Sequence, residues 1–120
     1  MGKRIKGIYP IDIEEGLPDV DAALRMLEYQ FASAYCIGER VVKVIHGCGS
    51  KGNGGGRLKT ETRRWGRKDP RVGMLVKGEA FSVSNPQVQY LIEKFPHVAE
   101  DEDLENENPE ISIFFINAKK

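Results

Sequence analysis

The chain has 120 residues, of which 40% are hydrophobic and 30% are charged, and these proportions predict one globular domain with its own core. No apolar run could span a membrane, the N-terminal residues lack the apolar core of a signal peptide, and two cysteines make no disulfide framework. These features exclude a membrane protein and a disulfide scaffold, and they predict a cytoplasmic protein with no membrane partner.

The formal net charge of zero hides two segments of opposite sign. Residues 39–77 carry eleven Lys or Arg and three Asp or Glu, whereas residues 100–110 carry seven acids and no base. A basic block on a neutral chain is typical of a polyanion-binding face. The alternative is that these charges only keep the surface soluble.

Hydrophobic periodicity and capping residues predict strands and helices in alternation. The predicted strands cover residues 5–13, 41–45, 72–76 and 111–116, and the predicted helices cover residues 19–35, 57–65 and 86–95. Gly66 is expected to end the second helix. The acidic run AEDEDLENENPE is expected to form an exposed, mobile loop. The alternation predicts one compact α/β domain.

Residues 41–65, VVKVIHGCGSKGNGGGRLKTETRRW, combine a predicted strand, a glycine-rich loop (46–56) and a predicted helix. A P-loop is excluded because no Gly-Lys-Ser/Thr follows at the required spacing. A dinucleotide-binding loop is rejected as well. Its glycine pattern is present from Gly47, but more glycines follow where a helical turn is needed, and Glu79 comes too late to bind a ribose.

A loop for a nucleic-acid backbone fits this segment best. Glycines let main-chain N–H groups approach a phosphate, and the start of the next helix adds a favourable dipole. Such contacts give affinity without sequence specificity, so RNA and DNA both remain open. The expected phosphate-binding residues are Gly47, Gly49, Lys51, Gly54, Gly56, Arg57, Lys59, Arg63 and Arg64.

The same segment resembles the central signature of the Smr (small MutS-related) domain. That signature is a hydrophobic strand, His-Gly-x-Gly, a glycine-rich loop, and Leu-Arg/Lys opening a helix that ends near a Trp. The matching positions are Val44, Ile45, His46, Gly47, Gly49, Gly56, Leu58, Lys59 and Trp65. IDIEEGLPDVDAAL is similar to the family's opening motif, Leu-Asp-Leu-His-Gly, at Ile11, Asp12 and Ile13.

The resemblance implies an α/β fold: a two-layer sandwich of a roughly four-stranded mixed sheet with two to three helices, like the C-terminal domain of bacterial translation initiation factor three. It also implies nucleic-acid binding, with endonuclease (nicking or RNA-cleaving) activity in several members. We expect a single domain over residues 1–120. Its core would cover residues 8–78 and 110–118, and an extra helix and the acidic loop would occupy residues 85–110.

Two departures from the family pattern bear on cleavage. Glu14 stands where the opening motif has the His tied to nuclease activity, and the terminal Gly-Gly-x-Gly-Ala motif is missing. His46 is the candidate general acid/base, with Asp12 as its partner and Glu14 as a third candidate. The alternative is a structural role: His46 stabilises the loop, and Asp12 and Glu14 are ordinary charged residues at the end of a strand. The sequence identifies no cofactor, and dependence on a divalent cation, magnesium or manganese, is left open.

Binding is therefore favoured over cleavage as the function. The alternative is a non-catalytic interaction module that docks on a protein or a ribonucleoprotein such as the ribosome through the extra helix and the acidic loop. A nucleotide-binding enzyme is a third hypothesis. Trp65 could stack a base, but it shares a helix face with Leu58 and Thr62, which favours a core position.

Overall fold

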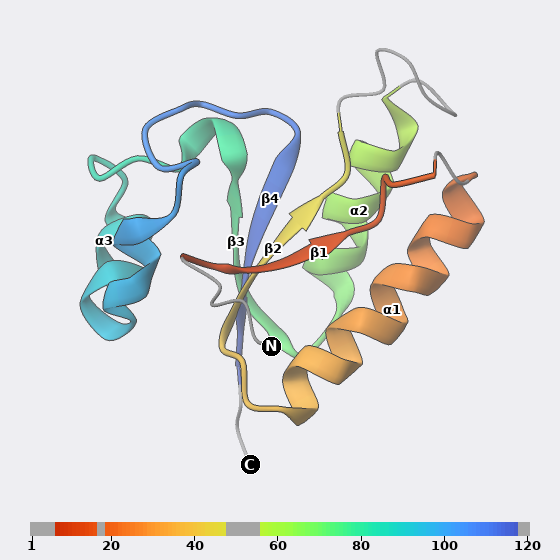
Figure 1. Ribbon diagram of the computed structural model, residues 1–120, viewed down its shortest axis with the longest axis horizontal. Coiled ribbons are helices and arrows are strands. Elements are labelled where there is room, and N and C mark those ends of the chain that lie inside the picture. Colours follow the sequence, from red (N-terminus) through yellow and green to blue (C-terminus); the bar gives the residue numbers. More distant parts are fainter. Residues whose placement is uncertain (1–6, 17–18, 48–55, 118–120) are drawn as a thin grey trace.

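The computed structural model describes residues 7–16, 19–47 and 56–117 (Figure 1). The strands are β1 (Tyr9–Asp12), β2 (Val41–Ile45), β3 (Val72–Lys77) and β4 (Ile111–Ile116). The helices are α1 (Val20–Cys36), α2 (Arg57–Lys68) and α3 (Pro86–Lys94), with 3-10 turns η1 (Gly78–Ala80) and η2 (Pro96–Glu100). Among these, no helix is long and apolar enough to cross a membrane.

The four strands form one mixed sheet in the order β1-β2-β4-β3. β1 and β2 are parallel, and β4 runs antiparallel to both of its neighbours, β2 and β3. β1, β2 and β3 therefore all end at one edge, and β4 begins there (Figure 1). This edge collects the segments that follow three strands, which is where an α/β sheet commonly carries its site.

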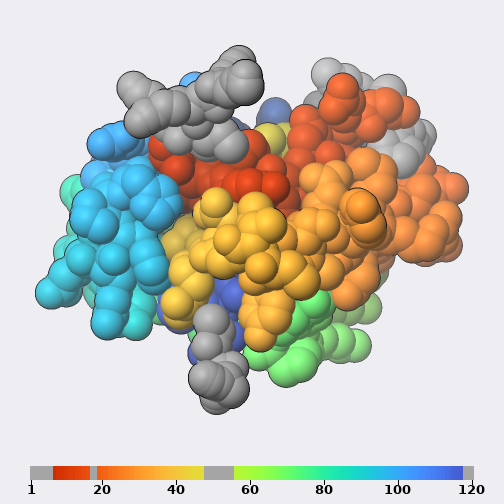
Figure 2. All heavy atoms as spheres, turned by 60° about the horizontal axis from the view of Figure 1, so that its bottom comes forward, coloured from red at the N-terminus to blue at the C-terminus, as the bar shows by residue number. Residues whose placement is uncertain are grey.

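Helices cover both faces of the sheet, with α1 and α2 on one face and α3 and η2 on the other (Figure 1). The space-filling view shows α1 and α3 on opposite sides of the segment that leads into β2 (Figure 2). Side chains of β2 and β4 alternate between two cores. Val42, Val44, Phe114 and Ile116 join the first, and Val41, Ile111 and Ile113 join the second. This explains why ISIFFI is apolar at nearly every position. The predicted α/β fold is confirmed.

Gly66 corrects the predicted end of the second helix. α2 continues to Lys68, and Gly66 is buried inside it. A Cβ at Gly66 would lie 2.7 Å from Phe114 Cζ and 3.1 Å from Leu75 Cδ1. The glycine therefore lets the helix approach the sheet closely, and its cost in helix propensity is outweighed by this packing.

The acidic run is anchored to the sheet, so the expectation of an exposed loop is wrong at its start. Lys43 projects from β2 towards the α3 side, where its Nζ lies 3.0 Å from Asp101 Oδ1 and 2.7 Å from Asp103 Oδ2. Asp101 is buried, and its Oδ2 accepts the backbone N–H of Ile8. Burial acts to lower the pKa of Lys43, but the hydrogen bonds to Asp103 and Asp101 outweigh it and raise that pKa. The ion pair is therefore maintained at neutral pH.

Replacing Asp101 tests this anchor. Asp101→Ala leaves the buried Lys43 ammonium with one carboxylate and the Ile8 N–H without an acceptor, so the free energy of unfolding should fall by about 3 kcal/mol. Urea unfolding monitored by circular dichroism measures this. Glu102→Ala, at an exposed position of the same run, should cost less than about 0.5 kcal/mol. Equal losses in the two variants would contradict the anchoring role.

Candidate functional site

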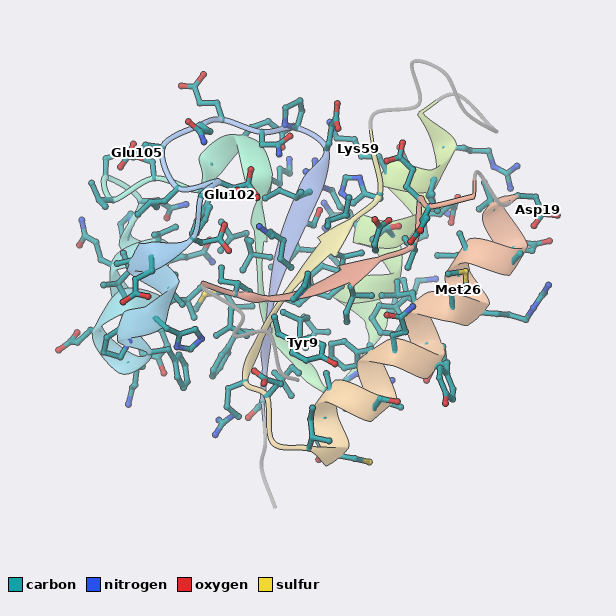
Figure 3. All side chains as sticks on the ribbon, in the orientation of Figure 1. Tyr9, Asp19, Met26, Lys59, Glu102 and Glu105 are labelled. Carbon is teal, nitrogen blue, oxygen red and sulfur yellow. The ribbon has the colours of Figure 1, made fainter. Side chains whose placement is uncertain are left out.

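The candidate site lies at the edge of the sheet where β2 ends. His46 and Gly47 follow β2 directly, Gly56 precedes α2, and the N–H groups of both His46 and Gly47 donate to the Glu110 carbonyl at 3.0 Å. Figure 3 shows Lys59 of α2 at this edge and the labelled Glu102 on the α3 side of the sheet. The first residues of the glycine-rich segment are therefore held by the residue before β4.

The ring of His46 is buried and both of its nitrogens have partners. Nδ1 lies 2.7 Å from the Gly47 carbonyl oxygen, and Nε2 lies 2.9 Å from Ser112 Oγ. The same hydroxyl accepts a hydrogen bond from Arg63 Nε at 2.7 Å, so its own proton is available for His46 Nε2. Nδ1 then carries the ring proton and donates it to Gly47. We assign the neutral Nδ1–H tautomer on this basis.

Burial lowers the pKa of His46 to about 4; the hydrogen bond to Gly47 opposes this shift, and the charges of Arg63 and Lys59 add to it. The imidazole is therefore neutral at neutral pH. A neutral ring with both nitrogens engaged can orient the Gly47 peptide, but its one N–H is donated to Gly47 and is too weak an acid to protonate a leaving group. This arrangement supports the structural role of His46 over the general acid.

Arg63 points into the protein and is not on the surface of α2 where it was expected. It is 6% exposed, and its Nη2 donates to the Ile111 carbonyl at 3.0 Å and to Glu79 Oε1 at 2.8 Å. Lys59 Nζ lies 3.2 Å from Glu79 Oε2. The hydrogen bond from Arg63 is the main cause that lowers the pKa of Glu79 to about 2, so this carboxylate is charged at neutral pH. Glu79 thus neutralises cations expected to bind phosphate.

Glu79 was not predicted as a site residue, because this glutamate lies outside the signature, 20 positions after Lys59. One signal was available. Glu79 is an isolated acid just beyond a predicted strand of the basic block, and strands of like direction end at the same edge of the sheet.

Asp12 does not orient His46 as expected. β1 and β2 are neighbours, with Asp12 in register with Ile45, which places the carboxylate next to the correct strand end. Its Oδ1, however, accepts the N–H groups of Glu14 at 2.9 Å and Glu15 at 3.0 Å. Asp12 therefore closes the turn after β1 and fixes the position of Glu14.

Glu14 lies directly against Gly47. Gly47 has φ +74°, and a Cβ there would overlap the Glu14 carboxylate. The opening motif and the central signature therefore meet at this glycine, which needs both the left-handed backbone and the missing side chain. The contact also puts a carboxylate beside the start of the expected phosphate loop, which disfavours a phosphate at Gly47 itself.

The exposed face of α2 is cationic. α2 begins at Arg57, right after Gly56, with no side-chain cap and no acid in its first turn. The exposed basic residues of the helix are Arg57, Arg64, Arg67 and Lys68. Among the residues that the structure describes, the carboxylate facing Arg64 is that of Glu61, at a long 3.8 Å. Helical spacing puts Arg57, Arg64 and Lys68 on one side, where they face solvent.

Trp65 is partly buried and packs against the first core through Phe31 and Phe114, with ring centroids 5.1 and 6.1 Å away, which agrees with the helix face predicted for it. Gly49, Lys51 and Gly54 lie outside the described residues. Within residues 7–16, 19–47 and 56–117, no group of three or more His, Cys, Asp or Glu is placed to hold a metal ion.

Comparisons with known proteins agree with the expected family. The Smr domain model matches residues 16–84, a range that includes His46, α2 and Glu79 and ends before α3. The crystal structure of the Smr domain of Thermus thermophilus MutS2 superimposes with a TM-score of 0.58 over 92% of this chain and 100% of that one, at 18% identity. At that identity the likeness shows the fold. No match was found among curated protein sequences.

The buried neutral His46 predicts a specific pH dependence of stability. Its folded pKa of about 4 lies below the ordinary 6.5, so the unfolded chain takes up a proton first as the pH falls. The stabilisation is complete above pH 6.5 and is lost as the pH approaches 4. Between pH 7 and pH 4.5, wild type should lose about 2 kcal/mol of unfolding free energy through this residue.

Urea unfolding at the two pH values measures this loss. His46→Gln has no titrating ring. Its loss of unfolding free energy over the same interval should therefore be smaller than that of wild type by about 2 kcal/mol. All carboxylates remain in both proteins, and their contribution cancels in the comparison. Equal losses in wild type and variant would mean that His46 titrates normally in the folded state.

Proposed function

Because the chain belongs to the Smr domain family, we propose that it binds the phosphodiester backbone of RNA or DNA through the glycine-rich loop and the exposed face of α2. The observation that carries this proposal is the cationic side of α2, formed by Arg57, Arg64 and Lys68 with Arg67 beside it. It begins at the helix N-terminus, where free N–H groups and the helix dipole also favour an anion. Contacts of this kind read the backbone and leave the base sequence unread.

Binding without cleavage is the form of this function that the site chemistry supports. A cleaving site needs a group that takes or gives a proton at the phosphate. His46 is neutral and engaged by Gly47 and Ser112, and Asp12 is engaged by the turn after β1. Glu14 replaces the family's His and lies against Gly47. Any cleavage would require His46 to give up a hydrogen bond that holds the loop.

Charge reversal on α2 tests the proposed surface. Arg64→Glu/Lys68→Glu should weaken binding of labelled RNA and DNA oligonucleotides by at least about tenfold, and the slope of log affinity against log salt should fall by about 2. Fluorescence anisotropy over a salt series measures both. The matched control is Arg25→Glu/Lys94→Glu, which makes the same change in net charge at exposed positions of α1 and α3.

Three outcomes separate the functions. Equal weakening by both double variants would mean that net charge, and not α2, controls binding. If wild type binds no single-stranded RNA, structured RNA or plasmid at low salt, the proposal fails and docking on a protein remains. Cleavage by wild type with magnesium, manganese or chelator present, lost in His46→Ala, would instead assign an endonuclease.

A further inference from the structure

Lys59, Arg63 and Glu79 have the geometry of an occupied anion site. Glu79 Oε1 lies 2.8 Å from Arg63 Nη2, and Oε2 lies 3.2 Å from Lys59 Nζ and 3.5 Å from Arg63 Nη1. Two carboxylate oxygens facing two cations reproduce how the two free oxygens of a phosphodiester are bound. We propose that Lys59 and Arg63 form a backbone-phosphate site whose place is taken by the Glu79 carboxylate in the free protein. This inference rests on the proposed function and deepens it.

The Arg63 guanidinium of this site is held in place independently of Glu79. Arg63 Nε donates to Ser112 Oγ at 2.7 Å and Nη2 to the Ile111 carbonyl at 3.0 Å, both on β4. These contacts fix the plane of the guanidinium from the protein side. If Glu79 turns away, the edge that it covered is presented to solvent in an unchanged orientation. An incoming phosphate therefore meets a preorganised donor.

Glu79 can turn away by side-chain rotation alone. Its side chain is 41% exposed, whereas that of Arg63 is 8% exposed. The η1 turn that carries Glu79 is packed tightly at its buried Gly78. A Cβ at this position would overlap the Asn108 carbonyl and come within 2.6 Å of Ile111 Cγ1, so the backbone of the turn has no room to shift. The contact with Lys59 is partly exposed, and ion pairs of that kind contribute little stability. Exchange of carboxylate for phosphate thus requires no movement of the backbone.

This arrangement favours a polyanion over a single phosphate. Lys59 and Arg63 lie one helical turn apart, and Arg67, an exposed cation of the same helix, follows Arg63 by one more turn. A lone phosphate must displace Glu79 without help. A strand already bound to the neighbouring cations supplies its next phosphate at high effective concentration. Glu79 therefore lowers the affinity for every nucleic acid and lowers it most for mononucleotides.

Glu79→Gln tests the inference, because it keeps the shape of the side chain and removes the charge. Its affinity for a labelled RNA oligonucleotide should rise about fivefold at physiological salt, and the slope against log salt should steepen by about 1. Glu61→Gln is the matched control. It removes one negative charge from α2 beside Arg64, at a residue that does not contact Lys59 or Arg63, and it should change affinity less than Glu79→Gln. Adding Lys59→Gln to Glu79→Gln should cancel the gain.

A measurement on the wild-type protein covers the case in which a variant fails to fold. The carboxyl ¹³Cδ signal of Glu79 should shift when the oligonucleotide is added, and that of the exposed Glu102 should not. Unchanged or weaker binding by a folded Glu79→Gln, a gain equal to that of Glu61→Gln, or a static Glu79 signal in a saturated complex would each overturn the inference. The proposed function would survive these results. It fails separately, if neither wild type nor Glu79→Gln binds any nucleic acid.

Discussion

The buried guanidinium of Arg63 is the interaction on which the site depends. A buried cation is costly unless its donors are satisfied, and Arg63 satisfies them with Ser112, Ile111 and Glu79. Arg63 on α2 contacts Ser112 on β4, and Ser112 in turn contacts His46 after β2. These contacts connect α2 through β4 to the end of β2. Gly47 and Gly56 stand at the two ends of the glycine-rich segment. One side-chain network thus fixes the separation of the two ends of the loop.

The same network limits what the site can do chemically. The low dielectric that strengthens the Ser112–His46 hydrogen bond also holds the ring neutral, and the positive charges of Arg63 and Lys59 act in the same direction. A histidine that must hold Gly47 is therefore unsuited to passing protons to a phosphate. In the family the opening motif has a second His, and here that position is Glu14, which contacts Gly47 and supplies a negative charge. The neutral, engaged His46 and the Glu14 carboxylate therefore give the site little of the proton transfer that cleavage requires.

The fold was predictable because its signals are local, and the site was predictable only in part because its contacts are not. Spacing along residues 20–36 and 57–68 and the β-branched run of β2 identify their elements from nearby residues. Arg63 and Arg64 look alike in sequence, yet a rotation of about 100° per residue buries one and exposes the other. Lys43 and Asp101 are 58 positions apart, so no local sequence pattern predicts that they form an ion pair. Gly66 was predicted to end the helix because the side chain that requires a glycine there, Phe114, lies on the distant strand β4.

The acidic run is part of the candidate site and not an appendage. It is anchored near its start, where Lys43 from the centre of β2 holds Asp101, and at its end, where the Glu110 carbonyl accepts the N–H groups of His46 and Gly47. Lys43 and His46 lie three positions apart on one chain segment, so both ends of the run are attached to it. A change at Asp101 should therefore be felt at His46 through the position of Glu110. The acidic run thereby helps to set where the glycine-rich segment begins.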